Sequence, residues 1–249
     1  MIVVGAGRIG TALHRLDPDA IALIDRTHGW ERLAGEPGEP ILITVRNDDL
    51  DVVLARVPAA RRGDLVFVQN GMLRPWLAEQ GLAGATRGLL FLAVVKRGDS
   101  ITPGGVSPFC GPHAAAIVET LTRFDVPAEV VGPARFVAIE LEKLIWNCAF
   151  GLCCEVFDFR VGEVVERRAD ELRGLVRELL AVGERVFDVT LELDPLFERL
   201  CDYSRSIADY RGAVKEWRWR NGAFVVAARQ QGIATPIHDR MLRATGHLA

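Results

Sequence analysis

The chain begins with Ile2-Val-Val-Gly5-Ala-Gly7-Arg-Ile-Gly10, a short apolar run that leads directly into three spaced glycines. Residues 2–4 predict a buried strand, and the residues from 9 onward predict a helix. In a G-x-G-x-x-G turn of this kind, the first glycine permits the tight turn, the second admits a pyrophosphate and the third lets the helix pack on the strand. We therefore predict that a dinucleotide is bound by Gly5, Ala6, Gly7, Arg8, Ile9 and Gly10.

An acidic residue at the end of the next predicted strand supports this interpretation. Asp25 lies about 20 residues after Gly5, where a carboxylate accepts hydrogen bonds from the adenosine ribose and repels a 2′-phosphate. Asp25 therefore favours NADH. Arg26 follows it immediately, and Arg46 follows the third predicted strand. Because two arginines can hold a phosphate, the residues leave the choice between NADH and NADPH open.

The first half of the chain alternates short apolar runs with helical stretches. Strands are predicted at residues 2–4, 20–24, 40–44, 64–69 and 89–95. Helices are predicted at residues 9–16, 50–56, 72–80 and 114–124. Nearly continuous apolar strands separated by helices are typical of a parallel sheet that is covered on both faces.

The composition changes at Val131-Gly132-Pro133. Beyond this point strand signals nearly vanish. Helices are predicted at residues 134–157, 206–220 and 222–231, and residues 162–189 are predicted to contain another with charge on one face. We therefore predict an α/β protein, with a Rossmann-type parallel-sheet domain over residues 1–132 that binds a dinucleotide. An all-helical domain over residues 133–249 would carry the substrate-binding and catalytic groups.

Composition and charge exclude several classes of protein. The 249 residues are 49% hydrophobic and 25% charged, an ordinary globular mixture, and the net charge is −3. Such a chain has no basic excess to bind nucleic acid by its field alone. The longest nearly uncharged stretch, residues 144–154, is shorter than the roughly 20 apolar residues that a membrane span needs. We expect neither a nucleic-acid partner nor a membrane partner.

The cysteines indicate a reduced, cytoplasmic protein. They form an odd set without a C-x-x-C pair, and no cysteine–histidine spacing resembles a zinc site, so no metal is expected. The chain start also lacks the pattern of a signal peptide. We expect no chemistry from Cys110, Cys148, Cys153, Cys154 and Cys201.

A lysine on the long apolar helix is the candidate proton donor. Lys143 and Asn147 lie one turn apart on the same helix face. A partly desolvated lysine has a lowered pKa, which suits proton donation to a developing alkoxide. The alternative is a surface lysine that pairs with Glu140 or Glu142. Glu216 is the distant carboxylate that we assign to this lysine, although a solvated surface role for it remains open.

Five motifs occur in an order that resembles one family. After the glycine turn come Gln69-Asn70-Gly71-Met72, Lys143-x-x-x-Asn147, Glu216 with Asn221-Gly222, and Gly232-Ile-Ala-Thr-Pro236. Over essentially its whole length, the chain resembles the ketopantoate reductase (2-dehydropantoate 2-reductase) family. The resemblance implies an NAD(P)H-dependent oxidoreductase that reduces a 2-oxo acid, ketopantoate to pantoate by default, and it implies NADPH as the cofactor.

The resemblance also implies roles for individual residues. Lys143 would donate the proton to the carbonyl oxygen as hydride arrives from the nicotinamide C4, and Glu216 would bind the substrate hydroxyl or hold Lys143. Asn70 would lie by the nicotinamide ribose and the substrate, and Asn147 would orient the substrate. The basic residues that family members use for the NADPH 2′-phosphate correspond to Arg26 and Arg46.

Three departures from the family pattern affect the substrate pocket. The second asparagine of the family, two turns after the lysine, is Gly151 here, which predicts open space. The serine segment is irregular, with Ser206 as its substrate-binding candidate, and Arg218 replaces an acidic residue and could meet a second anionic group. These departures keep open an imine- or opine-type dehydrogenase, another carbonyl dehydrogenase, or a non-catalytic nicotinamide-nucleotide-binding module. The exact substrate, the direction of reaction and a possible homodimer also stay open.

Overall fold

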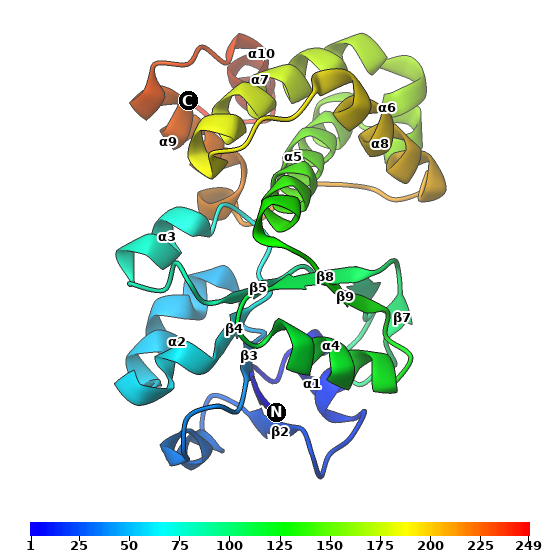
Figure 1. The fold of residues 1–249 in the computed structure, drawn as a ribbon. Helices are drawn as coiled ribbons and strands as arrows, with labels where there is room; N and C mark the ends of the chain where they lie inside the picture. The colour runs from blue at the N-terminus through cyan, green and yellow to red at the C-terminus, as the bar shows by residue number, and fades with distance from the viewer. The chain divides into compact units, whose positions relative to one another are not determined.

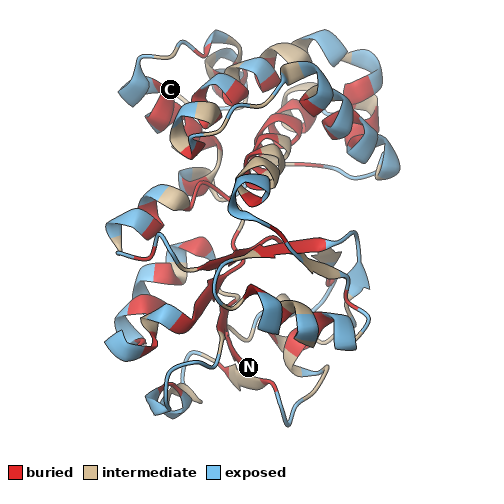
Figure 2. Ribbon diagram, viewed as in Figure 1, coloured by how far each residue is buried: buried red, intermediate tan, exposed pale blue.

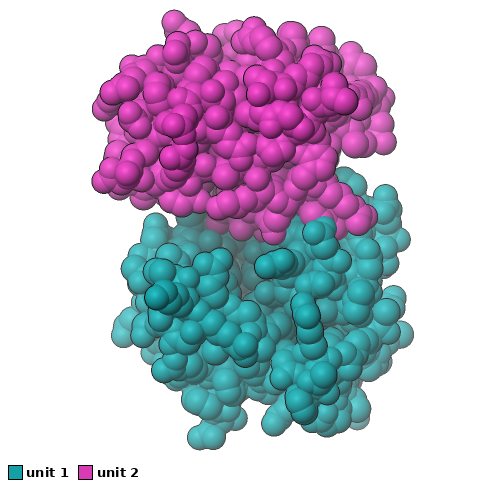
Figure 3. Space-filling model, turned by 180° about the vertical axis from the view of Figure 1, so that it is seen from behind, with its two compact units in different colours: residues 1–69, 73–136 teal, residues 70–72, 137–249 magenta.

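A computed structural model describes residues 1–249, which separate into two compact units (Figure 3). The first unit comprises residues 1–69 and 73–136, and the second comprises residues 70–72 and 137–249. The chain passes from the first unit to the second inside the first turn of the helix that begins at Pro133. The short segment 70–72 belongs to the second unit although both of its flanks belong to the first.

The first unit is built on a seven-stranded sheet (Figure 1). Its strand order is β2-β1-β3-β4-β5-β8-β9, and all neighbours are parallel except β5 and β8. The strands are β1 (Ile2–Val4), β2 (Ala22–Ile24), β3 (Ile41–Ile43), β4 (Leu65–Phe67), β5 (Thr86–Gly88), β8 (Ser107–Cys110) and β9 (Ala128–Val130). The helices are α1 (Arg8–His14), α2 (Leu50–Arg56), α3 (Arg74–Glu79) and α4 (Ala114–Arg123), with 3₁₀ turns η1 (Trp30–Ala34), η2 (Asn47–Asp49) and η3 (Ala59–Asp64).

Helices cover both faces of this sheet because its strands are apolar on both sides. On one face Val3, Leu42 and Val66 join a buried cluster with side chains from α1 and α4. On the other face the ring of Phe67 meets Trp76 of α3 edge-on, with 5.8 Å between ring centroids. Successive residues of a strand point to opposite faces, so Val66 packs in the layer of α1 and α4, and Phe67 packs in the layer of α3. Figure 2 shows the central strands β1, β3 and β4 as buried, whereas the edge strands β2 and β9 are only partly buried.

The predicted strand over residues 89–95 is wrong. The sheet strand is β5 (Thr86–Gly88), and the chain leaves the sheet after Gly88, whose missing side chain leaves room for the ring of Phe109. Within the predicted range only β6 (Leu92–Ala93) is extended, and it pairs with β7 (Thr102–Pro103) in a separate two-stranded sheet. The sequence patterns also missed β8 and β9.

The second unit is helical. It consists of α5 (Pro133–Phe157), α6 (Val161–Arg167), α7 (Ala169–Phe187), α8 (Leu193–Ser206), η4 (Trp217–Trp219), α9 (Asn221–Gln231) and α10 (Pro236–Ala244). The middle of α5 is apolar on nearly every side, and Leu141, Cys148 and Phe150 are fully buried in the main cluster of this unit. A helix that is hydrophobic all round belongs in the middle of a bundle. The predicted α/β class, a Rossmann-type sheet followed by helices, is confirmed.

One predicted helix of this half is confirmed and another is wrong. The helix predicted within residues 162–189 is α7, which is separated from α6 at Arg168, whose φ of −138° and ψ of 30° lie outside the helical region. The helix predicted over residues 206–220 does not form, because α8 ends at Ser206. The backbone beyond it bonds to α6 instead: Gly162 N–H donates to Ala208 O at 3.1 Å, and Val161 N–H donates to Tyr210 O at 3.0 Å.

The chain from residue 207 to 216, which we call the crossing segment, is also attached to α5. Gly151 of α5 has no Cβ, and one built there would lie 2.6 Å from Ala213 O. Further along α5, a carboxylate oxygen of Glu155 accepts a hydrogen bond from Val214 N–H at 2.9 Å. The predicted open space at Gly151 is therefore wrong, since the backbone of the crossing segment fills it. No helix of the protein combines the length and the apolar character that crossing a membrane requires.

Candidate active site

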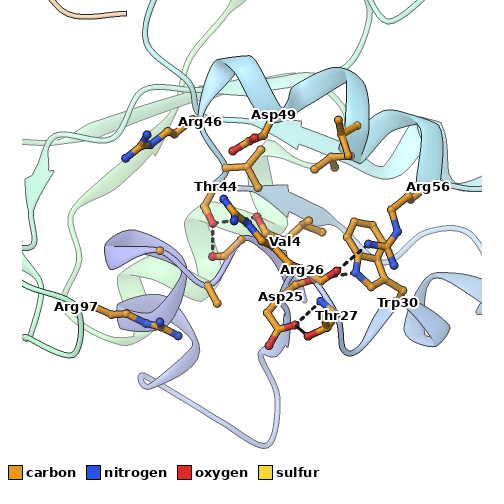
Figure 4. Close-up of a pocket in the computed structure, with 16 residues that line it drawn as sticks. Val4, Asp25, Arg26, Thr27, Trp30, Thr44, Arg46, Asp49, Arg56 and Arg97 are labelled. Atoms are coloured by element: carbon orange, nitrogen blue, oxygen red, sulfur yellow. Dashed lines mark hydrogen bonds between the residues drawn. The ribbon is translucent and has the colours of Figure 1, made fainter.

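A cavity of about 740 Å³ opens in the first unit at the carboxyl ends of β1, β2 and β3 (Figure 4). Its walls include Gly5 after β1, Asp25 after β2 and Thr44 after β3. The chain runs from β1 outward to β2 and then returns to β3 on the other side of β1. In open α/β sheets, ligands bind at such a reversal of strand order. The volume is that of a small-molecule or cofactor site.

The glycine turn at this cavity fits the phosphates of a dinucleotide. Gly5 has a φ of +117°, and a Cβ on it would lie 2.9 Å from Thr44 Oγ1. A Cβ on Gly10 would collide with the carbonyl oxygen of Gly5, so this glycine lets α1 pack against the turn. A Cβ on Gly7 would meet no atom within 4 Å, and Gly7 lines the cavity. The second glycine thus leaves the backbone open to an approaching ligand, as a pyrophosphate requires.

The carboxylate of Asp25 is engaged in its own turn. Its Oδ1 accepts hydrogen bonds from Thr27 N–H at 2.7 Å and from His28 N–H at 2.8 Å. These backbone donors hold the pKa of Asp25 well below its usual range. In Figure 4 the carboxylate is directed toward Thr27. Part of its accepting capacity is therefore used before any ribose hydroxyl arrives.

Arginines dominate the charge around the cavity. The predicted residues Arg26 and Arg46 line it, and so do Arg56 and Arg97, which the sequence patterns did not indicate. Arg56 stacks on the ring of Trp30 at 3.6 Å from its centroid (Figure 4). Arg56 lies at the end of a predicted helix, and Arg97 lies in a loop. At such positions the sequence does not indicate which cavity a charged side chain will face. Against these four cations the lining offers two carboxylates, those of Asp25 and Asp49.

Not every residue predicted to bind the cofactor lines the cavity. Gly5, Ala6 and Gly7 do, whereas Arg8, Ile9 and Gly10 do not. Arg8 is exposed, and its guanidinium donates to Val95 O at 3.2 Å. Ile9 packs against a buried cluster beneath α1. A direct role of these three residues in binding stays a prediction.

In the second unit, the predicted pair Lys143 and Asn147 shares one face of α5. Asn147 Nδ2 donates to the backbone oxygen of Lys143 at 2.8 Å, which fixes the orientation of the amide. Lys143 is partly buried, and desolvation, assisted by the nearby positive charge of Arg220, lowers its pKa to about 7. At neutral pH this lysine is therefore divided between the ammonium and the amine. The alternative partner Glu142 instead pairs with Arg199 at 2.8 Å.

Glu216 pairs with an arginine that the sequence analysis did not single out. Arg220 Nη2 lies 2.6 Å from Glu216 Oε2, and Arg220 Nη1 lies 3.5 Å from Asn147 Oδ1. Glu216 has a φ of +47°, a left-handed conformation that is strained for a residue with a side chain. It directly precedes η4, and Arg220 directly follows it. The irregular turn thus brings both side chains together, which the predicted helix over these residues obscured.

Asn70 belongs to the same unit as these residues. The segment 70–72 is bound through Met72, whose N–H donates to Trp219 O at 2.7 Å. Gly71 has a φ of +116°, a conformation that glycine adopts without strain. A tight turn therefore places the asparagine two residues from a backbone contact with η4. Its predicted role beside the cofactor and the substrate stays a prediction.

The two remaining substrate-binding candidates are exposed. Ser206 lies at the end of α8, and its hydroxyl donates to Tyr203 O at 2.7 Å. Arg218 of η4 lies over the ring of Trp219, 5.1 Å from its centroid. By contrast, Ser204 is fully buried and accepts a hydrogen bond from Trp146 Nε1 at 2.9 Å. The roles predicted for Ser206 and Arg218 stay predictions.

The cysteines and the one buried histidine contribute to packing in the structure. All five thiols are free, and burial raises the pKa of Cys148 to about 12. His238 is fully buried, with its Nε2 2.9 Å from Asn221 Oδ1, and desolvation lowers its pKa to about 4. A neutral imidazole of this kind joins α10 to the start of α9.

A glycine turn at a nucleotide-sized cavity and a lysine of lowered pKa are typical of NAD(P)-dependent oxidoreductases. Residues 135–249, nearly the whole second unit, match the family described as Ketopantoate reductase PanE/ApbA C terminal. This match over the C-terminal part of ketopantoate reductases, which are NAD(P)-dependent oxidoreductases, confirms the resemblance seen in the sequence.

Solved structures share the complete fold at low sequence identity. A D-mandelate dehydrogenase with NADH has a TM-score of 0.75 at 15% identity, covering 98% of this chain and 97% of that one. A PanE/ApbA family ketopantoate reductase from Ralstonia eutropha JMP134 has a TM-score of 0.74 at 18% identity, with the same coverage. A 2-dehydropantoate 2-reductase from Geobacter metallireducens GS-15 has a TM-score of 0.74 at 15% identity and covers 98% and 99%. No curated protein sequence matches this chain.

Proposed function

We propose that the protein reduces a 2-oxo acid to the corresponding 2-hydroxy acid, with ketopantoate as the first substrate to test. The observation that carries this proposal is the environment of Lys143, an amine with a pKa of about 7 beside Asn147 and Arg220. A general acid is most effective when its pKa lies near the working pH. The structural relatives that are ketopantoate reductases and a D-mandelate dehydrogenase support a carbonyl or hydroxy-acid substrate.

When bound, a reduced nicotinamide would supply the hydride to the carbonyl carbon and would itself be oxidised. Lys143 donates a proton from its ammonium to the carbonyl oxygen and is left as the neutral amine. One C=O bond order is lost, and one C–H and one O–H bond form. Asn147, whose amide is held by the backbone of Lys143, presents its Oδ1 on the same face of α5 and orients the reacting groups.

We propose that the cofactor is NADPH. Four arginines line the cavity of the first unit and outnumber its two carboxylates, those of Asp25 and Asp49, so the net charge of the lining favours a phosphate. Arg26 and Arg46 are exposed at the carboxyl ends of β2 and β3, so their guanidinium groups are accessible to a phosphate. The Gly5–Gly7 turn would hold the pyrophosphate.

The test is oxidation of NADPH and of NADH by the purified protein, measured in parallel with ketopantoate and with a panel of other 2-oxo acids. We expect turnover with at least one 2-oxo acid, faster with NADPH. Lys143→Ala should lower turnover by roughly 10²- to 10⁴-fold and leave cofactor binding in place. Lys215→Ala, an exposed lysine of the crossing segment, is the matched control and should keep full activity. Reduction only when an amine is added would replace this reaction by an imine reduction.

A further inference from the structure

The guanidinium of Arg220 is a buried cation that the proposed proton transfer does not require. Its side chain is 11% exposed. Nη2 lies 2.6 Å from Glu216 Oε2, and Nη1 lies 3.5 Å from Asn147 Oδ1. Its charge also acts on Lys143, one turn before Asn147 on α5. Arg220 is therefore part of the same group of side chains as the lysine.

One donor of this guanidinium has no partner and another is weakly bonded. The Nε atom is buried and has no hydrogen-bond partner. The contact of 3.5 Å from Nη1 to Asn147 is at the outer limit of a hydrogen bond, so only the bond to Glu216 is short. Buried donors without a partner are uncommon and costly in native proteins. The incomplete bonding of Arg220 points to an acceptor that arrives with a ligand.

The charges around Arg220 indicate the sign of that ligand. A guanidinium is always charged and only donates hydrogen bonds, so the group that completes it must be an acceptor. Hydrogen bonds to guanidinium are strongest when the acceptor is an anion such as a carboxylate or a phosphate. The same charge acts on Lys143, which places the anion near the lysine.

We propose that Arg220 binds the carboxylate of the 2-oxo acid, an inference that rests on the proposed function. The planar fork of a guanidinium matches a carboxylate through two parallel hydrogen bonds. Glu216, in its strained turn, holds the guanidinium in place through Nη2. In a 2-oxo acid the carbonyl carbon is bonded directly to the carboxylate, so an anchor at Arg220 brings the carbonyl oxygen to Lys143. The site then selects 2-oxo acids over uncharged ketones and aldehydes.

The kinetic test compares an acid with its ester. With the full chain and NADPH, we expect Arg220→Met to raise the KM for 2-oxo-3-methylbutanoate about 10- to 100-fold, as loss of a charged hydrogen bond predicts. The KM for its methyl ester should change far less. Arg220→Lys keeps the charge and should recover part of the difference, which also covers the case that the methionine variant does not fold. Arg240→Met, an exposed arginine of α10, is the control.

A second readout does not depend on turnover. The chain has three lysines, Lys96, Lys143 and Lys215, and the other two are exposed and serve as internal references. Competitive acetylation over a pH series reports the pKa of Lys143. Oxamate, a carboxylate that is not reduced, should raise this pKa by about one pH unit, because an anion at Arg220 offsets its charge. Methyl oxamate should not, and in Arg220→Met oxamate should lose its effect.

The two readouts separate the anchor from the reaction. An Arg220-dependent effect of oxamate without turnover of any 2-oxo acid would support the anchor and contradict the proposed reaction. Equal KM increases for acid and ester, or an effect of oxamate that persists in both Arg220 variants, would overturn the anchor. If the anchor is overturned in either way, turnover of 2-oxo acids that depends on Lys143 would still support the proposed reaction.

Discussion

Ala213 O lies 2.6 Å from the position that a Cβ on Gly151 would occupy, so α5 and the crossing segment meet backbone to backbone. Gly212 approaches the same point, with its own Cβ position 3.1 Å from Gly151 Cα. The absence of a side chain at residue 151 is therefore a packing requirement. It is also what allows the crossing segment to lead into Glu216, the partner of Arg220.

Gly151→Asn should destabilise the second unit, because the new side chain must displace the backbone of Ala213. Overpacking of this kind costs about 1–3 kcal/mol in the free energy of unfolding, which urea titration measures. Gly84→Ala is the matched control, since a Cβ there meets no atom within 4 Å. Wild-type stability in Gly151→Asn would show that the crossing segment moves aside at little cost.

Lys143→Met should make the protein more stable and inactive. Folding lowers the pKa of Lys143 from 10.5 to about 7, so between these values the unfolded chain binds more protons. This desolvation penalty is fully present below pH 7 and fades as the pH rises toward 10.5. We expect the variant to gain about 1–3 kcal/mol at pH 7 and less at pH 9.5. Thermal unfolding of both proteins at the two pH values measures the difference, and a gain that grows with pH would have the wrong sign.

The double variant of Arg26→Met and Arg46→Met should lose the proposed preference for NADPH. Removing two charge-assisted contacts to a 2′-phosphate is expected to raise the KM for NADPH by 10-fold or more, on the order of the loss for charged hydrogen bonds. The KM for NADH should change little. Arg32→Met, an exposed arginine of η1 outside the cavity, controls for a general loss of charge. Equal losses for both cofactors would argue against a phosphate contact.

Gly7→Ala and Gly10→Ala should separate binding from folding. A Cβ on Gly7 points into open space at the cavity, so this variant should keep its thermal stability and bind NADPH more weakly. A Cβ on Gly10 collides with the carbonyl oxygen of Gly5, so this variant should lose both stability and binding. Nucleotide titration and thermal unfolding of the two variants measure the contrast. Identical behaviour of both would contradict the assigned roles.

The parts of the fold that are set by local pattern could be predicted from the sequence. The buried strands β1 and β3, the glycine turn and the long apolar helix α5 follow from residues close together in the chain. The crossing segment could not be predicted, since several of its backbone groups form hydrogen bonds with α5 and α6, which are distant in the sequence. The strand β5 was missed because it is three residues long and contains Thr86, Arg87 and Gly88.

The candidate site divides in the same way. Lys143 and Asn147 were accessible to sequence reasoning because one helical turn relates them. Arg220 was not, since its meeting with Asn147 spans 73 residues and depends on an irregular turn at Glu216. The one feature of the sequence that indicates Arg220 is its position directly before the motif Asn221-Gly222. The arginine predicted to bind an anion was instead Arg218, which is exposed.

The central claim is that Lys143 is the proton donor, and its titration alongside the rate tests this claim most directly. Competitive acetylation of Lys143 and kcat/KM for 2-oxo acid reduction should be measured across the same pH series. We predict that the lysine becomes reactive with a midpoint near pH 7 and that kcat/KM falls over the same range, because only the ammonium can donate. Acetylation of Lys143 in step with Lys96 and Lys215, or a rate independent of pH between 6 and 9, would contradict the claim.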